Sequence, residues 1–476
     1  MTEPPFCYRW ILLGALVLPG LYLPMLKAPF DFTEDSCLVY PQAETPGEIL
    51  SQVMQSTWRE FQTTGPFRPV TWAHWHSAAS LFGPRAELRR MMRLLWCMLT
   101  TATLLLLLRE INASLPAAFV CAAYAMWNPF RAEIWLNLGM PEAFAYPYAM
   151  LALYASLRGA RSESPWGWDV LGWVMLLLCL GIKNVFIALI PALVWFRLMA
   201  GQRPWQQQWP GALGYGLLAL LPLLHFAWLK LDPKPTHFPT QLSLAQAIHF
   251  IRAFASAISF YTLLPTFVVL VFAVRWQSLL KHGPILVGAV LLIVSGMAIY
   301  MPITEMYPRY TMPAVWGYDL VLALVLTQLT TLPLFTRQLV WAGLLLTLAL
   351  VGWRCLNRQD LLLARCQMNW LALRYLENHL ANPPLANHTV ALVHPTQGTN
   401  HLDLSLGECF HLVGHLHHRK RLQAVLQYGP EAGEAGWVLA GQRYDPGSGY
   451  QLEREFVGRR RLPGEDFRCR LWKRVE

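Results

Sequence analysis

The sequence predicts an all-α polytopic membrane bundle of about eleven transmembrane helices, with amphipathic helices in its first outer loop and a small soluble α/β domain at the carboxyl end. Two observations favour this class. The 476 residues are 55% hydrophobic and only 14% charged, against about 25% charged in a soluble domain. In addition, apolar runs suited to crossing a bilayer recur along most of the chain. Length alone would suggest about three soluble domains, so composition decides the class.

The apolar runs form eleven segments. A membrane-crossing helix needs about 20 mostly apolar residues, and shorter ones are tolerated inside a bundle. The segments lie near residues 10–26, 91–108, 115–128, 141–157, 168–182, 184–198, 211–229, 257–274, 284–301, 312–331 and 338–354. The first follows Arg9 without a small-residue cleavage site after it, which predicts an uncleaved signal anchor.

The basic residues predict the orientation of the bundle. Cytoplasmic loops carry an excess of Lys and Arg. One set of short loops holds Arg9, Arg109, Arg158, Arg161 and further basic residues up to Arg337. We therefore expect an integral protein of the bacterial inner (plasma) membrane with a cytoplasmic amino terminus. An odd number of spans then makes the carboxyl-terminal domain extracytoplasmic.

The loops and the tail carry structure of their own. Residues 46–63, 71–83 and 240–256 have apolar side chains at helical spacing, which predicts amphipathic helices lying along the membrane surface. We expect a transmembrane domain over residues 1–355 and a soluble domain over 356–476. The soluble domain should begin with a helix and continue with a strand-like run at 388–395.

The charge and cysteine content exclude some classes. Net charge is +10, but the basic residues are spread over loops and the tail, so we expect no nucleic-acid partner. The nine Cys contain no C-x-x-C pair. The alternatives are free thiols or, in an extracytoplasmic tail, a disulfide among four residues. Those four are Cys355, Cys366, Cys409 and Cys469.

Four histidines stand close together in the tail, and they raise the question of a zinc site. They are His411, His415, His417 and His418. No paired Cys or Glu completes such a site. A solvated basic helix near anionic headgroups is therefore favoured, and no metal-ligating residues are predicted.

Three carboxylates are crowded into PFDFTEDSCLVYP (29–41), just after the first apolar run. They are Asp31, Glu34 and Asp35, and such neighbours repel and raise one another's pKa. A cluster of this kind is typical of a cation site or of a general base beside a reacting group. The alternative is an acidic turn that stays solvated. A divalent cation, Mg²⁺ or Mn²⁺, therefore stays open as a cofactor.

The order of several motifs resembles the GT-C superfamily, the membrane glycosyltransferases that use polyprenyl-phosphate sugars, and especially its protein O-mannosyltransferase branch. Glu34-Asp35 is similar to the branch's acidic pair. The stretch 67–70 (FRPV) resembles its Tyr-Arg-Pro-Leu-like segment, and 81–83 (LFG) resembles its Phe-Gly turn. The likeness covers roughly residues 10–200, with a weaker echo at 300–315.

Two later stretches carry the same resemblance. Residues 128–158 (NPFRAEIW…YASLR) resemble the hairpin of the third and fourth spans, and 181–195 (GIKNVFIALIPALVW) resembles the Lys-Glu segment. In this sequence Asn184 stands where the branch has Glu. Any role of that Glu is therefore lost or moved.

The resemblance implies an integral-membrane glycosyltransferase. It would move a hexosyl or pentosyl group from a polyprenyl-phosphate donor to a protein, lipid or glycan acceptor on the extracytoplasmic face. It also implies that Asp35 or Glu34, more than Asp31, is the general base. A transporter or flippase for a lipid-linked or anionic substrate is the main alternative, and a membrane scaffold is the third. A transporter should show repeated halves, and the sequence has no visible repeat.

Four residues are predicted to bind the donor: Arg309, Arg68, Lys183 and Tyr310. Arg309 lies in YMPITEMYPRYTMP between two apolar runs, and a guanidinium can bind two phosphate oxygens. Each cation has the alternative role of an interfacial residue that reaches toward the headgroups.

Four further polar residues are weaker candidates. Glu142 and Glu305 are expected to be cap or loop acids. His74 and His76 stand among tryptophans in the first loop and are expected to be interfacial.

Overall fold

The computed structural model describes residues 6–29, 45–83, 85–201, 203–231, 243–258, 279–301, 308–380, 390–393, 426–429, 437–441, 446, 448–463 and 466–475. Helices dominate. The first are α1 (Tyr8–Val17), η1 (Leu18–Lys27), α3 (Pro46–Thr64), α4 (Pro69–Phe82), α5 (Ala86–Glu110), α6 (Leu115–Trp127), α7 (Glu133–Leu136), α8 (Glu142–Arg161) and α9 (Trp166–Ile182). The later ones are η3 (Asn184–Leu189), α10 (Ile190–Met199), α11 (Trp205–Leu218), α12 (Leu220–Leu231), α13 (Leu244–Ala257), α16 (Gly283–Tyr300), η4 (Pro308–Thr311), α17 (Met312–Thr327), η5 (Gln328–Thr331) and α18 (Leu334–Leu380).

The helices form a membrane bundle, as predicted. Six described stretches are long and apolar enough to cross a membrane: Tyr8–Lys27, Ala86–Glu110, Trp205–Leu231, Gly283–Tyr300, Arg309–Thr331 and Leu334–Ala372. Three apolar helices are shorter: Leu115–Trp127, Trp166–Ile182 and Asn184–Met199. Of the eleven predicted spans, all but the eighth coincide with described helices. The eighth, 257–274, lies almost wholly outside the described residues.

Prolines explain why some spans mix two helical types. Pro24 stands inside η1, and Pro191 stands in the first turn of α10, directly after η3. Proline has no N–H, and its ring clashes with the preceding turn, so the α-helical hydrogen bonds are interrupted there. The first and sixth spans are therefore part α-helix and part 3₁₀-helix.

The core of the bundle is centred on α8, which packs against α5, α9 and α10. Most of its side chains are buried, and many are small. The fully buried small residues include Ala143, Ala145, Ala149, Ala152 and Ala155. Small residues let helix backbones approach closely, which is how helices associate where lipid leaves little hydrophobic driving force.

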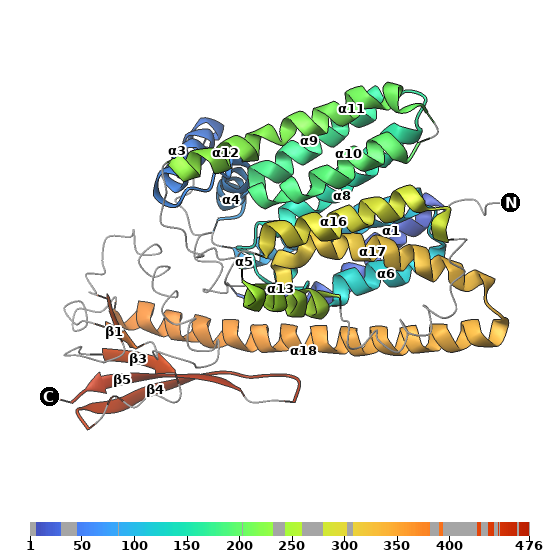
Figure 1. Cartoon of the computed structure of the whole chain (residues 1–476). Helices are drawn as coiled ribbons and strands as arrows, with labels where there is room; N and C mark the ends of the chain where they lie inside the picture. The colour runs from blue at the N-terminus through green and yellow to red at the C-terminus, as the bar shows by residue number, and fades with distance from the viewer. Residues whose placement is uncertain are drawn as a thin grey trace.

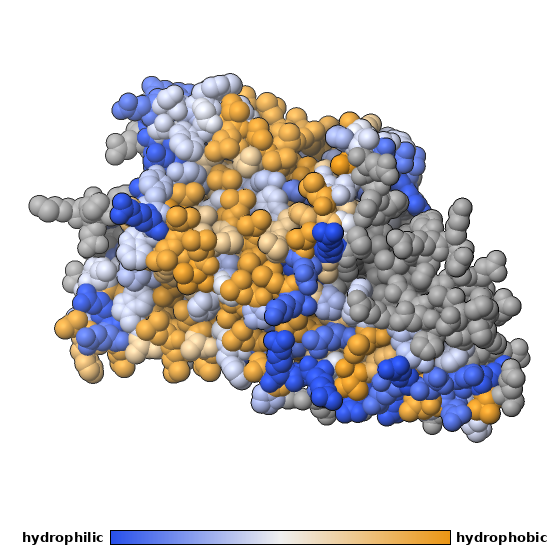
Figure 2. All heavy atoms as spheres, turned by 180° about the vertical axis from the view of Figure 1, so that it is seen from behind, coloured by the Kyte–Doolittle hydropathy of each residue, from blue (hydrophilic) through white to orange (hydrophobic). Residues whose placement is uncertain are grey.

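The outer surface fits a lipid environment. Figure 2 shows hydrophobic residues gathered over the helical part of one face, with hydrophilic residues at its margins and over the carboxyl-terminal part. Large apolar side chains are exposed on several helices, among them Leu12 of α1, Leu95 of α5, Leu224 of α12, Val294 of α16 and Leu346 of α18. In a soluble protein such a surface would aggregate, whereas in a bilayer it contacts the acyl chains.

The helices predicted in the first loop are confirmed as α3 and α4, and the helix predicted at 240–256 is α13. In Figure 1, α3 and α4 lie at one end of the bundle, and the amino terminus lies at the opposite end. Gly65 ends α3 with a φ of 92°, a backbone conformation that favours glycine. The sharp turn there allows α4 to start only a few residues later.

A mixed sheet lies at the same end of the molecule as α3 and α4 (Figure 1). Its strands are β1 (Val390–Val393), β2 (Leu426–Gly429), β3 (Trp437–Gly441), β4 (Tyr450–Gly458) and β5 (Phe467–Arg474). The order is β2-β1-β3-β5-β4. β1 is parallel to β2 and β3, whereas β5 is antiparallel to β3 and β4. The strand predicted at 388–395 is confirmed as β1.

The 47-residue helix α18 connects the bundle to this sheet. At 1.5 Å per residue it is about 70 Å long, and it packs against η1 and α6 as well as β4 and β5. The buried Asp360 carboxylate accepts the backbone N–H groups of Arg461 and Leu462 at 2.9 Å and the Arg460 Nε at 3.3 Å. The expected division after residue 355 falls inside this continuous helix.

The seven described cysteines are free thiols, and all but Cys7 are buried. They include three of the tail residues for which a disulfide was considered: Cys355, Cys366 and Cys469. Cys37 and Cys409 lie outside the described residues.

Candidate functional site

The contact between α4 and α9 places two of the predicted cations near each other. A Cβ on Gly181 would lie 2.5 Å from Val70 Cγ2, so only glycine permits this approach. Thr71 Oγ1 donates to the Ile182 carbonyl at 3.0 Å. Lys183 follows in extended conformation and ends α9. The first turn of α4, which follows Arg68, is therefore fixed against the end of the helix that presents Lys183.

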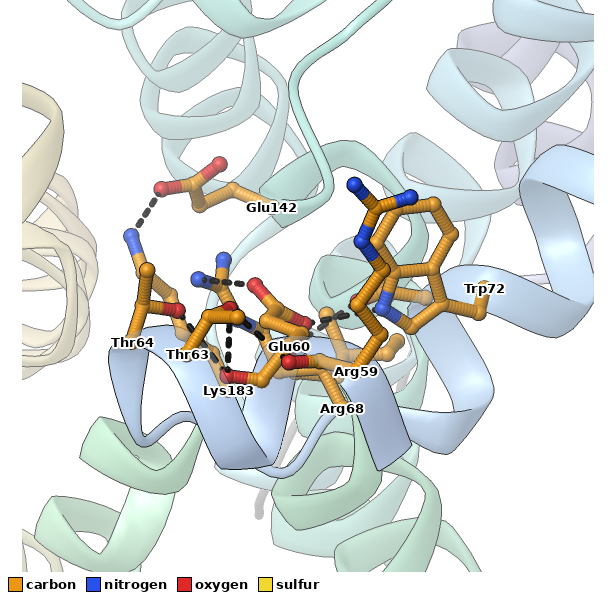
Figure 3. Close-up of polar contacts among 10 residues, drawn as sticks. Arg59, Glu60, Thr63, Thr64, Arg68, Trp72, Glu142 and Lys183 are labelled. Atoms are coloured by element: carbon orange, nitrogen blue, oxygen red, sulfur yellow. Dashed lines mark hydrogen bonds and ion pairs between the residues drawn. The ribbon is translucent and has the colours of Figure 1, made fainter. Parts of the chain in front are cut away.

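Lys183 forms an ion pair with Glu142, the first residue of α8. Its Nζ lies 2.5 Å from Glu142 Oε1, and the two side chains are 20% and 5% exposed (Figure 3). The same Nζ lies 4.6 Å from the centre of the Tyr310 ring, within the range of a cation–π contact. Glu142 Oε2 is buried without a hydrogen-bond partner in the described part of the chain.

Arg309 enters the same region from η4. Its Nη1 lies 3.1 Å from Glu133 Oε1, and Arg358 Nη2 of α18 lies 3.7 Å from that same oxygen. The neighbouring Tyr310 ring stacks on Tyr300 at 5.6 Å. Aromatic packing and an ion pair therefore both hold this short segment in place.

Arg68 is held by Glu60 of α3. Arg68 Nη2 lies 2.7 Å from Glu60 Oε1, and Trp72 Nε1 donates to Glu60 Oε2 at 2.8 Å (Figure 3). Arg68 Nε is buried without a partner among the described residues. Because Glu60 binds both side chains, it sets the position of Arg68 relative to α4.

Geometry and electrostatics both connect these cations. Lys183 Nζ and Arg309 Cζ lie 4.6 and 5.2 Å from the centre of the same Tyr310 ring. Burial lowers the pKa of Lys183, and the Glu142 carboxylate opposes that shift. The positive charges of Arg68 and Arg309 lower the pKa of Lys183 further. Arg68 and Arg309 are thus each close enough to influence Lys183, although the three cations come from three separate segments. An anion placed among them would relieve their mutual repulsion.

The predicted acids Asp31, Glu34 and Asp35 lie outside the described residues, as does Glu305. The chain enters the acidic segment at a defined point. The buried Arg90 side chain donates to the carbonyls of Ala28 (3.0 Å), Pro29 (2.8 Å) and Leu136 (2.6 Å). Leu136 ends α7, the short helix that begins with Glu133. Arg90 therefore connects the start of the acidic segment to the helix that holds Arg309.

A cavity of about 700 Å³ opens beside this junction. It is lined by residues from three elements that are remote in sequence. They are Lys27, Ala28 and Pro29 after the first span, Arg85, Ala86, Glu87 and Leu88 at the start of α5, and Gln367, Trp370 and Leu371 of α18.

The two histidines of the first loop are packed between helices and do not join the cation cluster. His74 stacks on Phe144 with ring centres 4.4 Å apart, and burial and Arg93 lower its pKa to about 4. His76 is 3% exposed, and its Nε2 lies 2.9 Å from Ser56 Oγ. The tail histidines His411, His415, His417 and His418 lie outside the described residues. Within the described part of the chain, no group of three or more His, Cys, Asp or Glu residues could hold a metal ion.

Sequence reasoning found the cations but not their partners. Glu133 and Arg358 were not identified, and Glu142 was regarded as a cap or loop acid. Each of these pairs joins residues far apart in the chain: Arg309 and Glu133 are 176 residues apart, and Lys183 and Glu142 are 41 apart. Glu133 begins the four-residue helix α7, and no pattern in the sequence distinguishes it.

Together these features define a polytopic membrane protein with a cationic cluster at one end of its helical bundle. No family model matches the sequence, and no curated protein matches it. Among solved structures, the crystal structure of ArnT from Cupriavidus metallidurans bound to undecaprenyl phosphate is similar. The TM-score is 0.54 at 12% sequence identity, and the match covers 99% of each chain. The chain therefore has the GT-C fold, as the sequence motifs implied. The O-mannosyltransferase branch stays a prediction.

Proposed function

We propose that this chain is an integral-membrane glycosyltransferase that takes its sugar from a polyprenyl-phosphate donor. One observation carries the proposal: Lys183 and Arg309 meet at the Tyr310 ring, and the contact of α4 with α9 brings Arg68 beside them, on a bundle of the GT-C fold. Converging cations of this kind suit a phosphate group. The similar ArnT structure contains undecaprenyl phosphate, a lipid of the donor class, which supports the assignment.

The proposed chemistry needs these charges. The bond between the sugar's anomeric carbon and the phosphate oxygen breaks, and its electron pair stays on the phosphate. A new bond forms from the acceptor oxygen to the same carbon through an oxocarbenium-like transition state. Arg309, with Lys183 beside it, would stabilise the charge that grows on the leaving phosphate. Asp35 or Glu34 would take the proton of the acceptor hydroxyl.

The cavity beside Pro29 is the proposed entrance for the acceptor. It lies where the acidic segment begins. Gln367, on its wall, is nine positions after Arg358 on α18, or about 13 Å along a helix axis. That separation leaves room for a sugar between the phosphate cluster and the acceptor. The polar and aromatic lining, with Lys27, Glu87 and Trp370, suits a hydroxyl-bearing protein, lipid or glycan.

The proposed side of reaction is extracytoplasmic. The basic residues Arg109, Arg158 and Arg161 lie at the opposite ends of α5 and α8 from the cation cluster. Positive charge of this kind marks the cytoplasmic side, which supports a site on the outer face of the inner membrane.

The experiment is a transfer assay with purified protein in nanodiscs and a radiolabelled polyprenyl-phosphate sugar. We expect release of polyprenyl phosphate together with a labelled product when a membrane extract supplies acceptors. Asp35→Asn and Glu34→Gln should lower turnover about 100- to 10,000-fold, as expected for loss of a general base. Arg337→Gln, at the cytoplasmic end, is the matched control. Movement of intact donor across proteoliposomes without bond cleavage would instead identify a flippase.

A further inference from the structure

One carboxylate oxygen lies between two guanidinium groups at the proposed phosphate site. Glu133 Oε1 is 3.1 Å from Arg309 Nη1 and 3.7 Å from Arg358 Nη2. The Glu133 side chain is 17% exposed and that of Arg358 is 39% exposed. This pairing is thus more open to solvent than the Lys183–Glu142 pair, in which the carboxylate is 5% exposed.

The charge of the lipid phosphate changes during the proposed reaction. In the donor the phosphate is a diester with one negative charge. In the product it is a monoester, whose second pKa is near 6, so it carries almost two negative charges at neutral pH. The same cations therefore bind the product more tightly than the donor. Without a counterbalance, product release would limit turnover.

We propose that Glu133 is a resident counter-ion that competes with the bound phosphate for Arg309 and so speeds release of the lipid-phosphate product. The inference rests on the proposed function. In the structure Glu133 Oε1 pairs with both Arg309 and Arg358. A phosphate that binds Arg309 must displace this carboxylate or share the guanidinium with it. When product leaves, the carboxylate pairs with Arg309 again, which offsets part of the cost of losing the phosphate.

Glu110 offers a matched control at the other end of the bundle. Its carboxylate lies 3.0 Å from Arg161 and 3.5 Å from Arg158, so it also joins two arginines, and its side chain is 10% exposed. Glu110→Gln removes the same charge and the same kind of ion pairs far from the cation cluster. General weakening of the bundle would appear in both variants.

The experiment measures undecaprenyl phosphate binding to nanodisc-embedded wild type, Glu133→Gln and Glu110→Gln. Glu133→Gln removes the charge that competes for Arg309. We therefore expect this variant to bind undecaprenyl phosphate about ten- to a hundredfold more tightly than wild type. In turnover assays of Glu133→Gln, kcat and KM should fall together because product release becomes slower. The single-turnover rate of bond cleavage should equal that of wild type. Glu110→Gln should match wild type. A purely structural role for Glu133 would weaken binding, so unchanged or weaker binding in Glu133→Gln would overturn the inference.

A shorter carboxylate keeps the inference testable if Glu133→Gln does not fold. Glu133→Asp retains the negative charge but moves it away from Arg309. We therefore expect the Glu133→Asp protein to bind undecaprenyl phosphate more tightly than wild type does. Wild-type affinity in a folded Glu133→Asp protein would count against the inference.

The proposed function and the proposed role of Glu133 can be tested separately. If wild type binds undecaprenyl phosphate and Arg309→Ala does not, the proposed function stands whatever Glu133 does. If wild type does not bind it, both ideas fail.

Discussion

At the scale of single residues, the cation cluster consists of charges that each have a carboxylate partner. Lys183 pairs with Glu142, Arg68 with Glu60, and Arg309 with Glu133. Partly buried cations without partners would destabilise the fold, so these acids let the cluster exist before a substrate arrives. The carboxylate beside Lys183 comes from Glu142 in another span, whereas the adjacent position in the chain is Asn184.

Arg309 is the residue whose replacement should most affect donor use. A charge-assisted bond to phosphate is worth about 1.5–3 kcal/mol. We therefore expect Arg309→Ala to lose about ten- to a hundredfold in kcat/KM, mainly in kcat if the bond tightens as the phosphate leaves. Arg309→Lys keeps the charge without the two-pronged geometry and should retain partial activity. Steady-state kinetics over a range of donor concentrations up to saturation measure both effects. Full turnover in Arg309→Ala would make this residue a headgroup anchor instead.

The sequence singled out the cations of the cluster but not their arrangement. Lys183 was identifiable because a charge between two apolar runs is costly and therefore conspicuous. Arg68, Arg309 and Tyr310 were identifiable because they stand in motifs that resemble the superfamily. Their partners were not, because Glu133 and Arg358 are brought to Arg309 only by the packing of α7, η4 and α18. The general-base assignment to Asp35 or Glu34 stays a prediction, since these residues lie outside the described part of the chain.

At the scale of elements, the position of Lys183 depends on how closely α4 approaches α9. Gly181→Ala would place a Cβ against Val70 Cγ2. Such overpacking costs about 1–3 kcal/mol, and it would push the start of α4, and with it Arg68, away from Lys183. We expect lower thermal stability and a higher KM for the donor. Val70→Ala removes the colliding atom, so the double variant should recover much of both losses. Failure of this rescue would show that Gly181 acts in another way.

The packing of α4 against α5 and α8 should make stability depend on pH. Burial holds the pKa of His74 at about 4 in the folded protein, whereas an unfolded histidine titrates near 6.5. Between these values the unfolded state binds more protons than the folded state, so stability falls as pH drops from about 6.5 toward 4. His76, whose pKa burial also lowers, adds to this trend. Between pH 7.5 and pH 5 the melting temperature should fall less steeply with pH in His74→Phe than in wild type. The same dependence of melting temperature on pH in both proteins would contradict this prediction.

The secondary structure was predictable to a large extent because apolar runs and helical periodicity are local properties. All predicted spans except the eighth, together with α3, α4, α13 and the strand β1, lie where the sequence placed them in the described part of the chain. The length of α18 was not predictable in the same way. The sequence becomes more polar after about residue 354, which suggests a new domain, but the helix continues. It packs against β4 and β5, and its Asp360 accepts backbone N–H groups from the segment between those strands.

At the scale of the whole molecule, the amino terminus and the carboxyl-terminal sheet lie at opposite ends of the bundle (Figure 1). With a bilayer around the apolar helices, we expect them on opposite sides of the membrane. Fusions of a reporter that is active only outside the cytoplasm should be inactive at residue 205 and active at residue 400. Activity only at residue 205 would show the opposite orientation, and activity at both sites would contradict the predicted topology. It would also move the cation cluster away from the extracytoplasmic face.

The central claim is that the cluster of Arg309, Lys183 and Arg68 binds the phosphate of a polyprenyl-phosphate lipid. The most direct measurement is a cryo-electron microscopy map of the protein in nanodiscs with undecaprenyl phosphate. We expect headgroup density within hydrogen-bonding distance of Arg309 and Lys183, with the acyl chain leaving sideways into the bilayer. Density for the phosphate elsewhere on the protein, with the Arg309–Glu133 and Lys183–Glu142 pairs undisturbed, would contradict it.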